Sequence, residues 1–530
     1  MILFATTTRK GSSRAVRAAA ALVLAVAIDL QPGVRADDLW QLPAAPVPAL
    51  RPTTPVRSCE SFTAAHVSAA ASVREARVMK SVDGADESCR LTIEVSTPLA
   101  PNIITVWLLL PTQHWNGRFL GLGGGGWIPG FPAALDAGAS RGFATAITNA
   151  GRPYDLSIDP QELDRLVGRN DFLLNAEGHL DWAELQNFAY RGIHEMTVVG
   201  KAVAKEFYGV PPRYAYFSGC STGGRQGQAE VQRYPQDYDG VLSGSPAINW
   251  AHFAAAESWP LTVTRELGDV PQCKLDAAHR AAVAACDGDD GARDGLVSGV
   301  GTCRFAAKAL VGMQTDCGVI QAWDAEVIGR IWDGPRRRDG SRLWNGIDRA
   351  ALIHAPQPPD NRPSPFSDGT APDTVGLTAD AFEVQFDRFV ERYGAVMDTS
   401  SPDLAAFAQH GKTILWHGIA DDIIPAAGTV HYVDSIRRTL GERETDRFLR
   451  LYLAPGVGHC GSGNGPQPVG LLEPLMQWVE QNHAPEAVRS ENRDQAAHIT
   501  RTRPLCPYPT IARYRGRGSL SDAASFRCQQ

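Results

Sequence analysis

The segment from Tyr214 to Tyr234 constrains the fold more than any other part of the chain. The apolar run Tyr214–Ser218 is typical of a buried strand, Gly219-Cys220-Ser221-Thr222-Gly223 turns sharply out of it, and a helix is predicted from Gly227 to Tyr234. A G-x-S-x-G turn between a strand and a helix exposes the serine hydroxyl and points helix amides toward it. The pattern alone is weak in a Gly-rich chain, so its strand and helix neighbours carry the argument.

Strands and helices alternate through much of the remaining chain. Strands alternating with helices indicate a mainly parallel sheet covered by helices on both faces, so an α/β fold is expected. Helices are predicted from Leu185 to Phe207 and from Leu471 to Gln481. Further strands are predicted at Arg90–Glu94, Ile104–Leu110, Arg118–Leu122, Gly142–Ile147, Gly240–Ser243, Lys412–His417 and Phe448–Leu453.

The alternation stops between residues 248 and 405, where the chain is mixed, contains several Trp residues and is Pro-rich at 356–372. A chain of 530 residues is too long for one small core. We therefore expect an α/β domain formed by 37–247 and 406–530, with 248–405 as an inserted domain. The tail from about residue 500 is predicted to be irregular.

The N-terminus has the pattern of an export signal. A basic start is followed by the apolar run Ala18–Ile28 and by Val34-Arg35-Ala36, which suits cleavage after Ala36. The run is about half of the roughly 20 residues that a membrane anchor needs. We expect a signal peptide at 1–36, a secreted or periplasmic protein, and no membrane association after cleavage.

Charge excludes one class of partner. The formal net charge is −7, and removal of residues 1–36, with five positive charges and one negative charge, makes it −11. No basic stripe is present, so nucleic acid is not an expected partner.

The cysteine count suits an exported chain. Ten cysteines follow the predicted signal, an even number that allows up to five disulfides. No C-x-x-C pair occurs, which argues against a zinc site.

Two polar residues follow later strands and complete a candidate catalytic triad with Ser221. Asp421 comes after Lys412–His417, and His459 comes after Phe448–Leu453. Both positions are loops at the carboxyl ends of strands, where such sheets place their sites, and the order Ser, acid, His suits a serine hydrolase. The neighbouring Asp422 is the alternative acid. His417 is disfavoured as the base because it lies at the strand end itself.

The developing oxyanion of such a reaction needs two backbone N–H donors. One is expected from Thr222, which follows the serine, and the other from the glycine run Gly123–Gly126. Gly125 and Gly126 both remain candidates. The alternative interpretation of the run is a flexible loop.

Cys220 precedes the serine and Cys460 follows the histidine. If Ser221 and His459 hydrogen-bond, these cysteines are close enough to bridge, and otherwise they are two unrelated buried residues.

With this arrangement, the chain resembles the tannase and feruloyl esterase family over roughly residues 55–530. Members carry Cys-Ser, Asp and His-Cys with that disulfide, and they include the hydrolase of mono(2-hydroxyethyl) terephthalate. The resemblance implies an α/β-hydrolase fold with 248–405 as a large lid. It also implies that Ser221 attacks the ester carbonyl, that His459 is base and then acid, and that Asp421 orients His459. The matching segments are Gly123–Gly126, Gly219–Gly224, Trp416-His417-Gly418 with Asp421 and Pro425, and Gly456–Cys460.

Carboxylates cluster between Cys286 and Leu296 on a Gly-rich loop that suits a hard cation but does not fit the EF-hand frame. The segment is similar to the calcium loop in the lid of this family. The resemblance implies one structural Ca²⁺ held by the carboxylates of Asp287, Asp290 and Asp294 and the carbonyls of Ala292 and Leu296. The alternative is a solvated acidic turn, and no organic cofactor is expected.

Beside this loop Cys286 and Cys303 are expected to bridge. The remaining cysteines are paired, partly by elimination, as Cys59–Cys89, Cys273–Cys317 and Cys506–Cys528.

The resemblance implies a secreted serine esterase acting on esters of aromatic acids of the feruloyl or galloyl type, free or polysaccharide-linked. The alternatives are another α/β-hydrolase, acting on a terephthalate monoester, a lipid or a peptide, and a non-catalytic calcium-stabilised binding protein. No residue is matched to a clamp for a substrate carboxylate.

Overall fold

The computed structural model describes residues 50, 53–63, 67, 70–80, 87–97, 100–153, 166–356 and 378–530. The signal peptide predicted at 1–36 lies outside these residues, as does nearly all of the Pro-rich stretch 356–372.

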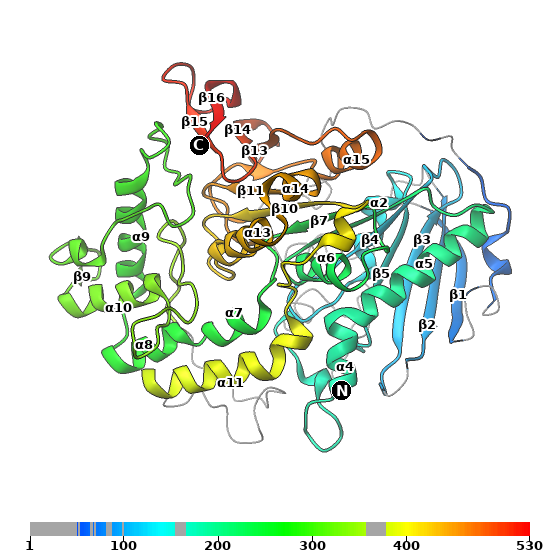
Figure 1. The fold of residues 1–530 in the computed structure, drawn as a ribbon, viewed down its shortest axis with the longest axis horizontal. Coiled ribbons are helices and arrows are strands. Elements are labelled where there is room, and N and C mark those ends of the chain that lie inside the picture. The colour runs from blue at the N-terminus through cyan, green and yellow to red at the C-terminus, as the bar shows by residue number, and fades with distance from the viewer. Residues whose placement is uncertain are drawn as a thin grey trace, which may run out of the picture.

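Nine of the described strands form the main sheet, which Figure 1 shows at the centre of the molecule. The strands from β5 to β11 are parallel, whereas β1, β2 and β3 are antiparallel, and β3 pairs antiparallel with β5. The predicted α/β class is confirmed. In spatial order the strands are β1 (Ala71–Lys80), β2 (Glu87–Val95), β3 (Ile104–Pro111), β5 (Ala144–Thr148), β4 (Arg118–Leu122), β6 (Tyr214–Cys220), β7 (Gly240–Gly244), β10 (Lys412–Gly418) and β11 (Leu449–Ala454).

Helices bury both faces of this sheet, and each face has its own hydrophobic cluster. On one face lie α5 (Gly192–Tyr208) and α13 (Ala426–Leu440), and on the other lie α2 (Leu135–Ala139) and α15 (Leu472–Gln481). The predicted helix Leu185–Phe207 corresponds to α4 (Trp182–Gln186), a π-turn at Asn187–Arg191 and α5 in succession. Gly209, with φ 75°, ends α5 as expected for a C-terminal glycine.

Helix α6 (Thr222–Arg233) follows β6 directly and begins five residues before the predicted Gly227. Its first turn contains Gly223 and Gly224, whose low helix propensity hides the start of the helix in the sequence. Tertiary packing requires those glycines: a Cβ on Gly223 would lie 2.8 Å from the Gly124 carbonyl oxygen, and a Cβ on Gly224 would lie 2.6 Å from the Gly244 carbonyl oxygen. The glycine loop after β4 therefore presses directly on the N-terminus of α6.

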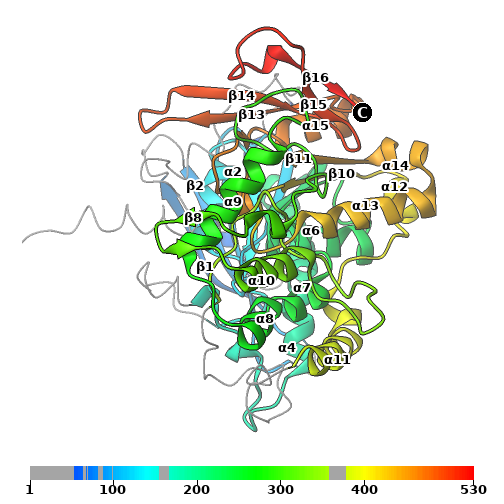
Figure 2. The same ribbon diagram turned by 90° about the vertical axis from the view of Figure 1, so that its left-hand side faces the viewer.

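The described part of the 248–405 segment is mostly helical and packs beside the main sheet (Figure 1). In the view of Figure 2, the helices of this segment face the viewer. It has a hydrophobic cluster of its own, built around residues such as Val263, Ile328 and Phe382. A further cluster joins it to the α/β part through Phe188, Trp250 and Tyr393. The helices are α7 (Trp250–Ala256), α8 (Trp259–Leu267), α9 (Gln272–Cys286), α10 (Ala322–Asp333) and α11 (Ala379–Met397), and α12 (Ala405–Ala408) leads back to β10.

The C-terminal tail is not irregular, so this prediction was wrong. The strands β12 (Gln467–Pro468), β13 (Val488–Arg493) and β14 (Ile499–Leu505) form one small sheet, and β15 (Ile511–Tyr514) pairs with β16 (Phe526–Gln529). These strands are half exposed and rich in Arg, so they lack the apolar alternation by which strands are recognised.

All ten cysteines lie in the described residues, and the structure joins them in the expected pairs. The disulfides are Cys59–Cys89, Cys220–Cys460, Cys273–Cys317, Cys286–Cys303 and Cys506–Cys528. Within the described residues, no helix has the length and apolar character to cross a membrane.

Candidate active site

Ser221 occupies a sharp turn between β6 and α6. Its φ of 60° and ψ of −122° are uncommon for a residue with a side chain, and its N–H donates to the Gly244 carbonyl at 2.9 Å. A Cβ on Gly219 would lie 2.6 Å from the backbone of Gly223, so the turn closes in this way only with glycine at position 219. The turn holds the Ser221 backbone in a strained conformation at the N-terminus of α6, as a nucleophile requires.

The predicted acid and base meet at the carboxyl ends of adjacent parallel strands. Asp421 follows β10 and His459 follows β11, and the Asp421 Oδ2 to His459 Nδ1 distance is 2.8 Å. Asp421 is 1% exposed, and its Oδ1 accepts the N–H groups of Ile423 and Ile424 at 3.0 and 2.8 Å. The carboxylate is thereby fixed against the Nδ1 side of the imidazole, which leaves Nε2 for proton transfer.

The charges of this pair stabilise one another. Burial alone would raise the pKa of Asp421, but the His459 charge and the hydrogen bonds from His417 and His459 outweigh it and lower the pKa. Burial alone would lower the pKa of His459, but Asp421, together with the charges of Asp422 and Glu257, raises it. Asp421 therefore stays ionised and His459 becomes a stronger base than a free imidazole.

The Cys220–Cys460 disulfide joins the serine loop to the histidine loop, with the two Cα atoms 5.9 Å apart. Ser221 and His459 are the chain neighbours of these cysteines, so the disulfide holds them on the same side of the sheet. In the described part of the chain, the Ser221 hydroxyl makes no hydrogen bond to His459. Catalytic hydrogen bonds often tighten only when substrate is present.

His417 is a site residue that the sequence prediction did not assign. It is fully buried, its Nε2 lies 3.1 Å from Asp421 Oδ2 and 2.9 Å from the Ile424 carbonyl, and its Nδ1 lies 2.8 Å from Thr429 Oγ1. Because a carbonyl only accepts, Nε2 carries the proton and Nδ1 accepts from Thr429. His417 therefore donates to the Asp421 carboxylate and helps to hold it in place. Its place four residues before Asp421, at the end of a buried strand, was the signal available in the sequence.

The glycine loop distinguishes the two candidate oxyanion donors. The N–H of Gly125 donates to the Ile128 carbonyl at 2.9 Å, whereas the N–H of Gly126 has no acceptor among the described residues. The Thr222 hydroxyl donates to the Gly126 carbonyl at 2.6 Å, which ties the loop to the start of α6. Of the two glycines, Gly126 therefore has the amide available for a ligand.

The acidic loop after α9 is folded around its own carboxylates. Asp287 Oδ1 accepts the N–H groups of Asp294, Gly295 and Leu296 at 2.8–3.2 Å, and Asp290 accepts from the Ala292 N–H and the Ser298 hydroxyl. Two of the predicted ligand carboxylates are thus turned into the loop, with the Ala292 and Leu296 backbones beside them.

Asp294 is paired with Arg503 of β14, and both side chains are 3% exposed. Burial raises the pKa of Asp294; the charges of Arg503 and Arg501 oppose this rise, and the charges of Asp290 and Asp287 add to it. Its Oδ1 is buried without a hydrogen-bond partner among the described residues. The residues suit a cation in their chemistry, since the carboxylates repel one another and Asp287 lies at the negative C-terminal end of α9.

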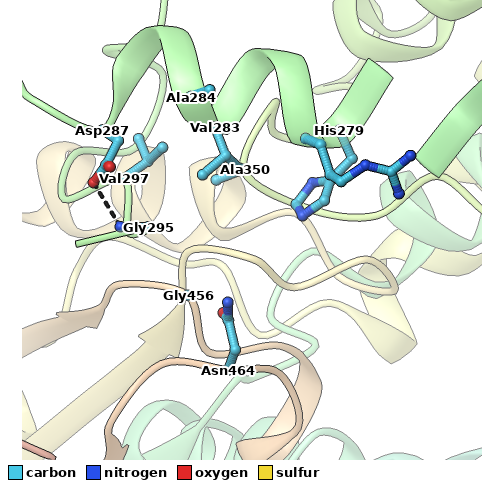
Figure 3. A pocket seen from close by; sticks show the side chains of 10 residues that line it. His279, Val283, Ala284, Asp287, Gly295, Val297, Ala350, Gly456 and Asn464 are labelled. Carbon is cyan, nitrogen blue, oxygen red and sulfur yellow. Dashed lines mark hydrogen bonds between the residues drawn. The ribbon is translucent and has the colours of Figure 1, made fainter. Parts of the chain in front are cut away.

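A pocket of about 310 Å³ lies between α9 and the histidine loop (Figure 3). His279 and Val283 line it from α9, and Gly456 and Asn464 line it from the loop that contains His459. Asp287, with its hydrogen bond to the Gly295 N–H, closes one end. The acidic loop and the histidine loop are therefore neighbours across this pocket.

The sheet, the sharp serine turn and the buried Asp–His pair define an α/β-hydrolase. Comparison with known proteins gives the family: residues 89–363 and 366–529 match the model for tannase and feruloyl esterase, and the chain belongs to this family. It is a carboxylic ester hydrolase.

Individual relatives agree with this assignment. A probable feruloyl esterase of Arthroderma benhamiae is 37% identical over 456 residues, covering 80% of this chain and 82% of the relative. The mono(2-hydroxyethyl) terephthalate hydrolase of Piscinibacter sakaiensis is 30% identical over 513 residues, covering 81% and 82%. The crystal structure of feruloyl esterase B from Aspergillus oryzae superimposes with a TM-score of 0.77 at 25% identity, covering 89% of this chain and 99% of that one.

Proposed function

We propose that the enzyme hydrolyses esters of aromatic carboxylic acids through an acyl-enzyme formed on Ser221. His459 Nε2 removes the Ser221 hydroxyl proton as Oγ attacks the ester carbonyl carbon. The N–H groups of Thr222 and Gly126 donate to the resulting oxyanion. His459 then gives its proton to the departing alcohol, and water repeats the sequence to release the acid and restore Ser221.

The observation that carries this proposal is the buried Asp421–His459 hydrogen bond of 2.8 Å, held beside Ser221 by the Cys220–Cys460 disulfide. Asp421 is fixed by two backbone amides as well, so the base is aligned before substrate arrives. A binding protein has no use for an aligned acid and base beside a strained serine, which favours catalysis over the non-catalytic alternative.

The aromatic side chains beside the glycine loop support the proposal that the acyl group of the substrate is aromatic. Trp127 directly follows Gly126, and its ring lies 5.4 Å from Trp250 of α7 and 5.0 Å from Phe188. Trp250 in turn stacks on Phe389 of α11 at 5.9 Å. A planar acyl group seated against Trp127 gains dispersion contacts and removes apolar surface from water.

The test is hydrolysis of methyl ferulate, methyl gallate and mono(2-hydroxyethyl) terephthalate, compared with an acetyl and a long-chain acyl ester of p-nitrophenol. Rates are measured for the wild type and for Ser221→Ala. We expect the aromatic esters to have the highest kcat/KM and Ser221→Ala to lose at least about a thousandfold in kcat. Unchanged hydrolysis by Ser221→Ala would overturn the mechanism, and preference for the long acyl chain would overturn the substrate class.

The terephthalate monoester is the second candidate, because the Piscinibacter sakaiensis relative is named for it. This substrate carries a free carboxylate beside its ester, so its site needs a positively charged side chain that galloyl and feruloyl esters do not require. Hydrolysis of the terephthalate monoester at a higher kcat/KM than methyl ferulate would favour this candidate.

We further propose that the acidic loop holds one structural Ca²⁺, with Asp287, Asp290 and Asp294 and the carbonyls of Ala292 and Leu296 as ligands. The unpartnered Asp294 Oδ1 and the mutual repulsion of the carboxylates support this. The ion would supply charge neutralisation and no step of the reaction. Elemental analysis should find one Ca²⁺ per chain, and a chelator should lower Tm; a metal-free protein with an unchanged Tm would exclude the ion.

Export is proposed on the predicted signal at 1–36 and on five disulfides, which persist in oxidising compartments. The N-terminal residue of the protein recovered from culture medium or periplasm tests the cleavage after Ala36. An uncleaved chain retained in the cytoplasm would contradict it.

A further inference from the structure

A second cluster of metal-binding side chains lies away from the triad. Among the described residues, His194, Glu230 and Asp237 are the one group of His, Cys, Asp or Glu whose ligand atoms all lie within 4.8 Å of one another. His194 comes from α5, Glu230 from the last turn of α6, and Asp237 from the loop before β7. The cluster therefore joins three consecutive parts of the α/β fold.

Glu230 is the member that needs an explanation. It is 1% exposed, and no N–H or hydroxyl group among the described residues donates to either carboxylate oxygen. Among these residues, its one neighbour within hydrogen-bond reach is the Asp237 carboxyl group, which can share a hydrogen bond with Glu230 only when one of the two is protonated. Burying a polar group without a partner is unfavourable, and burying an unpaired charge is more unfavourable still. Glu230 is therefore either protonated or, when ionised, in need of a cation beside it.

The other two members are ordered and reachable from solvent. His194 Nδ1 lies 2.7 Å from Asp237 Oδ2, and the His194 ring stacks on Tyr234 with centroids 3.8 Å apart. The side chains of His194 and Asp237 are 28% and 17% exposed. An ion can thus enter from the surface and meet Glu230 at the buried end.

The donor set indicates the kind of ion. One imidazole nitrogen and two carboxylates suit first-row divalent metals such as Zn²⁺, whereas Ca²⁺ prefers an all-oxygen set. Lys201 lies close by, donating to the Asp237 carbonyl, and its positive charge opposes a metal ion. With two carboxylates, one ammonium and a divalent ion, the cluster carries a net charge of about +1, which the exposed edge can solvate.

We propose that His194, Glu230 and Asp237 form a binding site for a single divalent transition-metal ion, with Zn²⁺ as its representative. The ion clamps the C-terminal end of α6 to α5. Ser221 and Glu230 are nine residues apart along α6, which is about 13 Å of helix. The site is therefore structural, and it stands whether or not the proposed ester substrate is correct.

Metal binding at this site has a measurable consequence for protons. Burial raises the pKa of Glu230 well above its ordinary value; the charge of Asp237 and a hydrogen bond with Asp237 raise it further, and the charge of Lys201 opposes the rise. A metal ligand must be deprotonated, so binding releases the Glu230 proton. Zn²⁺ titrations in different buffers should therefore give binding heats that change in proportion to the ionisation enthalpy of the buffer.

The experiment is calorimetric titration of the full mature chain with ZnCl₂, after chelator treatment and with excess Ca²⁺ present to keep the acidic loop occupied. Co²⁺ absorbance and Tm serve as independent readouts. We expect one ion per chain at this site, proton release and a higher Tm. Glu230→Gln keeps the shape of the neutral acid and should weaken binding more than the roughly 10–100-fold caused by loss of an outer-shell partner.

Two variants serve as controls. Glu195→Gln changes the neighbour of His194 on α5 and should bind Zn²⁺ as the wild type does. Lys201→Met removes the opposing charge and should tighten binding. The proposal is overturned if the wild type shows no stoichiometric Zn²⁺ binding, or if Glu230→Gln and His194→Ala bind it with wild-type affinity. In that case Glu230 and Asp237 form a carboxyl pair that shares one proton.

Discussion

Removal of the Cys220–Cys460 disulfide tests whether the enzyme depends on a covalent link between its nucleophile and base loops. The double variant Cys220→Ala with Cys460→Ala breaks the link without leaving a free thiol. The two residues are 240 positions apart in sequence. In the chain-entropy model a loop of this length contributes about 5 kcal/mol to the free energy of unfolding.

The same model gives about 3–4 kcal/mol for Cys59–Cys89, whose sequence separation is 30. This disulfide joins the short 3₁₀ helix Cys59–Ser61 to β2, far from the triad in sequence. For a chain of this size, 1 kcal/mol shifts Tm by about 1 °C. The two pairs should therefore differ little in Tm, by about 1–2 °C. They should differ strongly in activity, since only Cys220–Cys460 positions Ser221 and His459.

The assay compares kcat, KM and Tm for the two double-alanine variants, well below their melting temperatures. A misplacement of about 1 Å can cost a hundredfold in rate, so we expect loss of Cys220–Cys460 to lower kcat about 10–100-fold. Loss of Cys59–Cys89 should leave kcat unchanged. Equal kcat values for both variants and the wild type would refute the positioning role. If loss of Cys220–Cys460 lowered Tm and left kcat unchanged, this disulfide would be a stabilising cross-link only.

Three further predictions concern the base, the acid and the oxyanion loop. Glu257→Gln removes a negative charge that raises the pKa of His459. Because the base acts only when neutral, the acid side of the pH–kcat/KM profile should move to lower pH, and an unmoved profile would exclude the coupling. His417→Asn removes a hydrogen bond to Asp421 worth about 1–3 kcal/mol, so kcat should fall about 5–150-fold with little change in KM; an equal rise in KM would contradict a positioning role. Gly126→Ala should lower kcat about a hundredfold, because φ is 55° and a Cβ would lie 2.5 Å from Val167; wild-type kcat would exclude Gly126 as an oxyanion donor.

The central sheet was predictable because its strands are continuous apolar runs buried on both faces. The edge strand β1 was missed because its burial does not alternate regularly and its pairing with β2 shifts register between Val73 and Glu75. A one-residue shift moves side chains to the opposite face and destroys the period-two pattern. The start of α6 was missed for a different reason, since packing against the glycine loop overrides the low helix propensity of Gly223 and Gly224.

The acid and base were predictable because topology places the ends of β10 and β11 side by side. The choice between Gly125 and Gly126 could not be predicted, since both are glycines of one loop. Only the hydrogen bond from the Gly125 N–H to the Ile128 carbonyl distinguishes their amides. Glu257 gave no signal at all. It lies in the 248–405 segment, and only the folded chain brings its charge within reach of His459.

The candidate triad and the aromatic side chains proposed to contact the acyl group come from different parts of the molecule. His459 is fixed from the main sheet, since the Gly458 N–H donates to the Ser462 carbonyl at 2.7 Å and the Ala420 N–H donates to the Val457 carbonyl at 2.9 Å. Trp250 and Glu257, in contrast, come from the 248–405 segment, in which many of the described apolar side chains pack in a separate cluster. If the proposed function is right, changes in that cluster would alter the surface around the acyl group without moving the triad. The motifs on the main sheet therefore indicate the type of reaction, whereas the preferred acyl group has to be determined by a substrate assay.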